Sequence, residues 1–334
     1  MNITYLIGNG FDLGLGLKTK YEDFYPFFLE KADATSRLRK EIEISENSRY
    51  EKWSDLEMAL GKYTEKIEAT EEDINRFVDE KVELDQCLRD YLSREQEKFI
   101  IQNKSSIDSL ISALTHFKNG TNENEKALIK KSLESYMSAP FVYQCITFNY
   151  TKCVDQIWKA LSNEEIGKHT YGSKTYRDLI GDVLHIHGSL DDNEMILGVN
   201  DETQILNTAL AGNSYVKWAL IKPHLNQELG QNKIQKARKM IDSSVIICAY
   251  GMSMGQTDNM WWEYIGKWLK RRDTNIFVIY NYELNYQETH PVKRLMHIEN
   301  VRRFFLEKTK LTPSEQEAVS SKIVVFDNET VFAL

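Results

Sequence analysis

The stretch YLIGNGFDLGLGLKTKY, from Tyr5 to Tyr21, decides the fold, because an apolar strand-like start runs directly into a turn rich in glycine. Glycine lacks a Cβ and accepts positive φ, so such a turn can aim backbone N–H groups at an anion, often at the start of a helix. Gly8 and Gly10 therefore predict a nucleotide-binding turn after the first strand. The usual dinucleotide fingerprint has a further glycine where Leu13 stands, so a tight structural turn is the alternative.

The composition is that of a globular chain with a sizeable core. Of its 334 residues, 42% are hydrophobic and 28% are charged, and no apolar run is long enough to cross a bilayer. The start, MNITYLIGNG, has neither a basic n-region nor a small-residue cleavage site, so we expect a cytoplasmic protein. The net charge of −8 disfavours a broad contact with nucleic acid and favours a small-molecule ligand. The cysteines are scattered without a CxxC pair, which argues against a disulfide framework or a structural zinc site.

The pattern of apolar residues divides the chain into two parts. From about residue 37 to 137, apolar side chains recur at helical spacing among Glu and Lys, which predicts several amphipathic helices. From about residue 140 onward, short apolar strands alternate with helical segments, which is typical of a parallel sheet covered on both faces. We therefore predict a Rossmann-like nucleotide-binding domain made of residues 1–25 and 138–334, with a large helical insertion at residues 26–137.

The strands are expected to form an α/β fold with a doubly wound, mostly parallel sheet. Their predicted ranges are Ile3–Ile7, Phe141–Phe148, Asp182–Gly188, Ser244–Gly251, Asn275–Asn281 and Lys322–Phe326. In an open sheet of this class, ligands bind outside the carboxyl ends of the strands. The sequences FNYT, HGSL, GMSMGQTD and NYE, which begin at residues 148, 187, 251 and 281, should therefore line one crevice with the glycine turn. We expect the helical insertion to cover the mouth of this crevice.

Five motifs are distributed over nearly the whole chain. They are GNGFDLGLGLKTKYEDF from residue 8, FNYT from residue 148, HIHGS from residue 185, ILGVND from residue 196 and GMSMGQTD from residue 251. Together they resemble the AbiH family of bacterial abortive-infection proteins, and the first and last motifs are the most specific. The resemblance implies an antiphage role, with a phage-derived activator or a defence protein as partner. The amphipathic helical part offers enough surface for an interface, and we expect a homo-oligomer.

The order of the motifs is similar, more distantly, to that of the sirtuin-like NAD-binding fold. This resemblance implies NAD as the substrate, which the defence-associated branch hydrolyses. The resemblance places Gly8, Gly10, Gly16, Gly188, Gly251, Ser253 and Asn281 around the nucleotide. The full set of nucleotide-binding residues that we predict is Gly8, Asn9, Gly10, Phe11, Asp12, Gly16, Thr19, Gly188, Gly251, Ser253, Asp258 and Asn281. The zinc-binding cysteines of the protein deacylases are missing, so we do not expect deacylation. Lys18 and Asp12 also depart from the pattern, since Lys18 replaces a proline and Asp12 stands where a small serine is common.

Asn149 and His187 are the catalytic residues that the same resemblance implies, beside the nicotinamide ribose. Nicotinamide is a good leaving group, so the site must mainly orient the ribose, place a water and supply a base. Histidine suits the base near neutral pH, and an Asn amide can hold a ribose hydroxyl and the water. Because His185 and His187 alternate along a predicted strand, we expect both on the same side, with His185 as a hydrogen-bonded core residue. The alternative for Asn149 is a helix cap.

Two other functions are compatible with the residues. A metal-dependent phosphohydrolase or nuclease could draw its ligands from Asp12, His185, His187, Asp191, Asp192 and Asp201. NAD hydrolysis needs no metal, and on that hypothesis we expect none. A non-catalytic nucleotide sensor would bind the same ligand and signal through the helical part. A carboxylate at Asp12 would repel a pyrophosphate, so we expect it to hydrogen-bond the turn or to cap the following helix.

Overall fold

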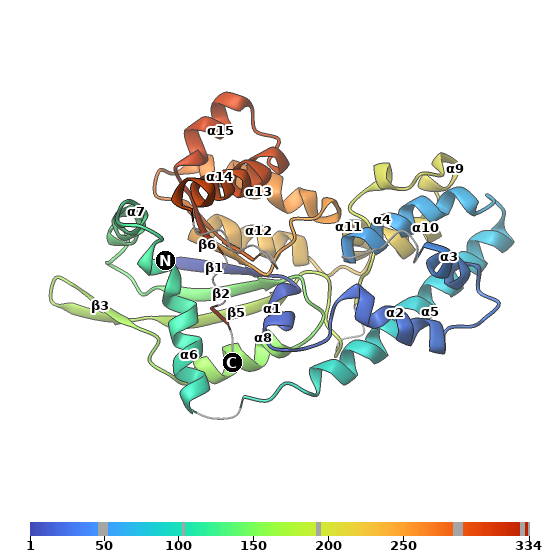
Figure 1. The fold of residues 1–334 in the computed structure, drawn as a ribbon, viewed down its shortest axis with the longest axis horizontal. Helices are drawn as coiled ribbons and strands as arrows, with labels where there is room; N and C mark the ends of the chain where they lie inside the picture. The colour runs from blue at the N-terminus through green and yellow to red at the C-terminus, as the bar shows by residue number, and fades with distance from the viewer. Residues whose placement is uncertain (46–52, 102–103, 192–194, 283–289, 328–330, 333–334) are drawn as a thin grey trace.

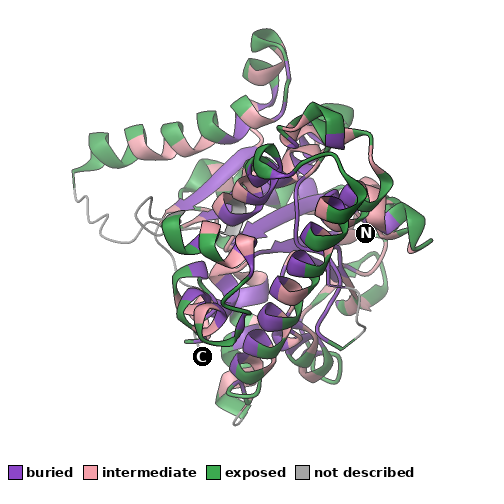
Figure 2. Cartoon of the chain, turned by 90° about the vertical axis from the view of Figure 1, so that its right-hand side faces the viewer, coloured by how far each residue is buried: buried purple, intermediate pink, exposed green. Residues whose placement is uncertain are grey.

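A computed structural model of the chain describes residues 1–45, 53–101, 104–191, 195–282, 290–327 and 331–332. The described residues form a six-stranded parallel sheet between layers of helices (Figures 1 and 2). Five of the strands are largely buried, whereas β5 at one edge is only partly buried. The strands are β1 (Asn2–Ile7), β2 (Val142–Thr147), β5 (Leu179–His185), β6 (Ser244–Tyr250), β7 (Ile276–Asn281) and β8 (Ile323–Asp327). The doubly wound α/β prediction is therefore confirmed, and each of the six predicted strands is present.

The strand order across the sheet is β5-β2-β1-β6-β7-β8, with every neighbouring pair parallel. The order of these strands along the chain makes this the Rossmann arrangement, in which the connections reverse direction between the first and the fourth strand. Those strands are β1 and β6 here. Ligands of such sheets bind at this switch point, outside the carboxyl ends of the strands.

The two faces of the sheet have separate apolar cores. Ile3, Tyr5 and Ile7 of β1 pack on one side, and Leu6 packs on the other. The first side is covered by α1 (Gly10–Gly14), α6 (Lys104–Thr115), α7 (Glu123–Glu134) and α8 (Cys153–Leu161). The second side is covered by α12 (Lys233–Ser243), α13 (Asn259–Arg271), α14 (Pro291–Lys308) and α15 (Pro313–Ser320).

A third core belongs to a group of helices that we call the helical lobe. It lies at the carboxyl ends of the strands, to the right in Figure 1. Its members are α2 (Tyr21–Lys31), α3 (Arg37–Ser45), α4 (Trp53–Tyr63), α5 (Glu71–Gln96), α9 (Thr208–Ala211) and α10 (Ser214–Leu220). We include α11 (Lys222–Glu228), which follows α10 directly and whose N-cap Ile221 belongs to this core. Packing thus divides the helices between β1 and β2, because α6 and α7 join the sheet while α2 to α5 join helices from residues 208–228.

Short elements complete the fold. A hairpin of β3 (Lys168–Tyr171) and β4 (Lys174–Arg177), which the sequence analysis did not predict, projects from the left of Figure 1. The 3₁₀ helices are η2 (Thr64–Lys66), η3 (His116–Asn119), η4 (Glu202–Gln204) and η5 (Gln256–Asp258). Within the described ranges, no helix combines the length and the apolar character needed to traverse a membrane.

Candidate active site

The glycine turn lies at the switch point, in close contact with the loop that follows β6. Gly8 N donates to Tyr250 O at 3.0 Å, and Gly10 N donates to Gly251 O at 2.9 Å. A Cβ on Gly10 would lie 2.6 Å from Gly251 Cα, and Gly251 itself has a φ of +67°. These glycines are therefore required for the close approach of two loops. Their contact with a nucleotide phosphate stays a prediction.

The rest of the turn is held by its own side chains. Asn9 Nδ2 donates to Thr19 O at 2.8 Å, and the Thr19 hydroxyl donates to Asn9 Oδ1 at 2.7 Å. Phe11 is fully buried in the sheet core. Gly16 has a φ of +80° and open space around the position of a Cβ. Among the residues predicted after β6, Ser253 is exposed.

Asp12 and Asn149 meet beside the turn. Asp12 is 2% exposed and accepts a hydrogen bond from the Thr151 hydroxyl at 2.7 Å. Burial raises the pKa of Asp12 to about 6, against the opposing effects of Thr151, the Asn149 amide and the nearby His185. Asn149 Nδ2 donates to Gly8 O at 3.1 Å. The polar residues after β1 and β2 are thus brought together, as the strand order predicts.

His185 is satisfied at both ring nitrogens. Its Nδ1 lies 3.0 Å from Asn149 O, and its Nε2 lies 2.7 Å from Oδ2 of Asp155 on α8. Both ring nitrogens are therefore engaged with protein oxygen atoms. His185 acts as a support for the Asn149 backbone, and neither ring nitrogen is available to bind a metal.

His187 points to the opposite side of the sheet from His185, contrary to the expectation from alternation. Strand β5 ends at His185, three residues before the predicted end at Gly188, so the strand alternation does not extend to His187. The His187 ring contacts Phe148 and Asp258, which lie with α13 on the second face. The next residue, Gly188, has a φ of +81° and turns the chain away.

A buried His187 and a partly buried Asp258 form an acid–base pair. His187 Nε2 lies 3.1 Å from Asp258 Oδ1, and His187 Nδ1 is buried without a hydrogen-bond partner among the described residues. Burial opposes ionisation of Asp258, but Lys222 and His187 outweigh it and hold the pKa of this carboxyl well below its usual range. An ionised carboxylate only accepts, so Nε2 carries the hydrogen and Nδ1 presents its lone pair. This is the arrangement of a general base.

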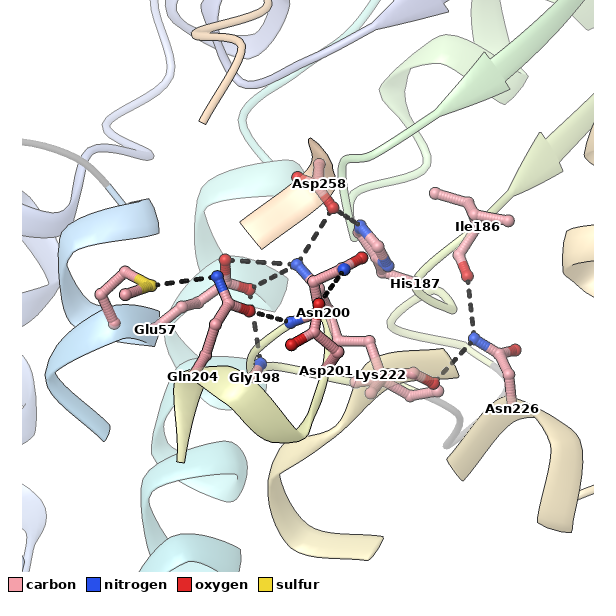
Figure 3. A network of polar contacts seen from close by, with 12 residues as sticks. Glu57, Ile186, His187, Gly198, Asn200, Asp201, Gln204, Lys222, Asn226 and Asp258 are labelled. Carbon is pink, nitrogen blue, oxygen red and sulfur yellow. Dashed lines mark hydrogen bonds and ion pairs between the residues drawn. The ribbon is translucent and has the colours of Figure 1, made fainter. Parts of the chain in front are cut away.

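Lys222 and Glu57 extend the pair into the helical lobe, as Figure 3 shows. Lys222 Nζ lies 3.1 Å from Asp258 Oδ1 and 3.0 Å from Glu57 Oε1, and both side chains are almost fully buried. Burial alone would lower the pKa of Lys222, but the two carboxylates raise it. The lysine is therefore a buried cation shared by two anions.

A cavity of about 10 Å³ lies beside this network, with room for one water molecule. Two polar atoms among its lining residues, Asn226 Oδ1 and Thr257 Oγ1, are buried and make no hydrogen bond within the described part of the chain. His187, Lys222 and Asp258 also line it. The cavity thus combines apolar walls with polar atoms that can hold a water.

Other predicted residues do not meet in one cluster. Asn281 Nδ2 lies 3.2 Å from Asp327 Oδ1 and 3.1 Å from His297 Nε2, at the end of β7 and β8. In the metal hypothesis, Asp201 caps η4 and Asp192 lies outside the described residues. No group of three or more His, Cys, Asp or Glu side chains among the described residues could hold a metal ion.

Sequence reasoning missed several residues of the site: Glu57, Thr151, Asp155, Lys222, Asn226 and Thr257. Thr151 was the easiest to find, because it belongs to the FNYT motif. Lys222 is the first residue of α11 and is followed by Pro223, a pattern that indicates a helix start but not the burial of a charge. Glu57 stands in an amphipathic helix, where a Glu is normally read as solvent-exposed.

Comparison with known proteins shows a match to one protein family. The family described as bacteriophage abortive infection AbiH matches residues 4–280, a span that includes the glycine turn, Asn149, His187 and Asp258. A search of curated proteins finds no match. Since the matched span is much more than half of the sequence, the chain belongs to the bacteriophage abortive infection AbiH family, and its role is in abortive infection by phage.

Proposed function

We propose that this protein hydrolyses NAD to nicotinamide and ADP-ribose as its abortive-infection activity. The observation that carries the proposal is the buried His187, whose Nε2 is held by Asp258 while its Nδ1 has no partner among the described residues. This group lies beyond the carboxyl end of β5, in a sheet with the Rossmann strand order. The motif order shared with sirtuin-like proteins supports NAD as the nucleotide.

The proposed reaction breaks the bond between the ribose C1′ and the nicotinamide nitrogen, and the oxygen of a water forms the new bond to C1′. His187 Nδ1 takes the proton from that water and later releases it to solvent. Asp258 fixes the ring with its hydrogen on Nε2, and Asn149 orients the ribose hydroxyl. The cavity of one-water size lined by His187 supports the placement of the water.

Asp12 has a place in this proposal as a proton-binding group. Its pKa is already raised to about 6 by burial, and a neighbouring pyrophosphate would raise the pKa further. We propose that Asp12 binds a proton when the nucleotide binds, which removes the repulsion between carboxylate and phosphate. Nucleotide affinity would then fall as the pH rises above 6.

The decisive experiment incubates purified protein with NAD and follows nicotinamide and ADP-ribose by chromatography, with magnesium in one arm and EDTA in another. We expect both products in equal amounts in both arms. Activity that EDTA abolishes would favour the metal-dependent hydrolase instead. Tight NAD binding without any product, measured by calorimetry, would favour a nucleotide sensor.

A further inference from the structure

A buried ion pair links the helical lobe to the proposed catalytic histidine. Glu57 comes from α4 and Lys222 from α11, both of which belong to the lobe, while Asp258 ends η5 beside the sheet. The exposed fractions are 6% for Glu57 and 3% for Lys222. Removing charges from water costs several kcal/mol per ion, so replacing such a pair by apolar side chains is often neutral or stabilising. Stability alone is therefore a weak reason for this pair.

The contacts of Lys222 point to a second role. Its Nζ lies 3.0 and 3.2 Å from the two Glu57 oxygens, and 3.1 Å from the Asp258 oxygen that also faces His187 Nε2. Glu57 Oε1 further accepts from Gly198 N at 3.3 Å, which fixes the carboxylate. A single oxygen of Asp258 thus connects the lysine with the imidazole (Figure 3).

We propose that Lys222, held by Glu57, is a positioning residue for the His187–Asp258 pair, and that the helical lobe acts through it on proton uptake by His187. The effect of Lys222 on turnover rests on the proposed NAD hydrolysis, whereas its electrostatic effect on the His187 ring does not. A displacement of the lobe that separates Lys222 from Asp258 would change both the orientation and the charge of the pair. The lobe is therefore the element through which a partner would regulate the site.

The charges around the His187–Asp258 pair determine whether each substitution promotes or hinders protonation of His187. Asp258 and Glu57 are negative and favour the protonated ring, whereas Lys222 is positive and opposes it. Tyr150 also interacts electrostatically with Asp258 and Glu57. Burial raises the pKa of its hydroxyl well above the usual value, so Tyr150 stays neutral. Removing Lys222 should therefore promote protonation of His187, and removing the Glu57 charge should hinder it.

The test uses full-length protein and follows the His187 ring by NMR across pH, with His187→Gln identifying its signal. We expect Lys222→Met to move the titration midpoint upward by about one pH unit and Glu57→Gln to move it downward by a similar amount. Lys81→Met is the matched control. Lys81 is a buried lysine of the same lobe that pairs with Asp85 at 2.6 Å, so its loss should lower stability without moving the midpoint.

Midpoints that do not move, or that move in the same direction in both variants, would overturn the proposal and leave a purely structural ion pair. If Lys222→Met does not fold, the isosteric Glu57→Gln decides alone, because an unchanged midpoint there contradicts the proposal. In active protein, the acidic limb of the pH–rate profile should shift with the midpoint. NMR shifts without any NAD turnover would confirm the link and refute the hydrolase, so the two failures are distinguishable.

Discussion

The Nε2 atom of His187 lies 3.1 Å from Oδ1 of Asp258, although 71 positions of sequence separate the two residues. The contact joins the loop after β5 to the start of α13, and each partner determines what the other can do. Asp258 keeps the hydrogen on Nε2, and the buried ring in turn helps to keep Asp258 ionised. In the proposed reaction, Nδ1 of this ring is the atom that accepts the proton of the attacking water.

Replacement of His187 by alanine should lower the turnover of NAD by about 100-fold or more, because a positioned base is lost. His187→Gln keeps a donor toward Asp258 without a base, and we expect it to lose as much activity while it retains more stability. Nicotinamide release and thermal unfolding of both variants check this. Full activity in His187→Gln would contradict a role as base.

His185→Ala is the matched control within the same motif. This ring is paired with Asp155 and Asn149 O, so its loss removes two buried hydrogen bonds. Each is worth about 1 kcal/mol, and the acceptors left unpaired add to the cost. We expect a lower melting temperature and a smaller loss of activity per folded molecule than in His187→Ala. Equal losses of activity, together with inhibition by EDTA, would favour the metal-dependent reaction.

Asn149→Ala should also reduce turnover by about 100-fold, since the amide is proposed to orient the ribose hydroxyl and the water. The KM for NAD should change less than kcat. The same amide donates to Gly8 O, so a moderate loss of stability is expected as well. Steady-state kinetics at a temperature where the variant is fully folded separate these effects, and unchanged kcat would remove Asn149 from the catalytic residues.

Asp12→Asn should stabilise the protein at neutral pH. The pKa of Asp12 is about 6 in the folded state, against 3.8 for an ordinary aspartate. The folded protein therefore holds this proton more tightly, and stability is lost as the pH rises from about 4 to 6. The loss amounts to about 3 kcal/mol at pH 7, which the neutral amide avoids. Urea unfolding at pH 4 and pH 7.5 should show a gain for the variant at the higher pH alone.

Gly10→Ala should destabilise the fold by about 1–3 kcal/mol, because its Cβ would lie 2.6 Å from Gly251 Cα in backbone that cannot move aside easily. Gly14→Ala is the control, since its Cβ would meet its nearest atom at 3.6 Å, an ordinary contact distance. Denaturant unfolding of the two variants checks the difference. A branched residue at Gly10 is consequently a poor probe of nucleotide binding, because it damages the fold.

The sequence predicted the sheet well, because parallel strands buried on both faces appear as short apolar runs between helical segments. The β3–β4 hairpin was missed, although the alternation in KHTYGSKTYR around Gly172 is a hairpin signal. The core into which each helix packs could not be predicted, because apolar periodicity shows that a helix has a buried face but not which other elements cover that face. That is why α6 and α7 were grouped with helices of a different core.

Within the candidate site, strand order explains why the residues after β1, β2 and β6 come together. The buried charges were beyond sequence reasoning. Lys222 and Glu57 are 165 positions apart, and in the sequence each resembles an ordinary surface charge. Only the packing of the lobe against the sheet shows that they are buried together. The side to which His187 points was predicted wrongly for a local reason, because β5 ends three residues earlier than its apolar pattern indicated.

The place of β1 in the middle of the sheet has a consequence for synthesis of the protein. The N-terminal nitrogen of Met1 donates to Pro140 O across 139 positions, and the hydroxyls of Thr4 and Ser244 meet across 240 positions. The first strand therefore gains its neighbour β2 in the first half of synthesis, but it lacks β6 until residues 244–250 have been made. Asp258 emerges later still. A nascent chain on the ribosome therefore cannot bring His187 and Asp258 together until at least 258 of the 334 residues have been made.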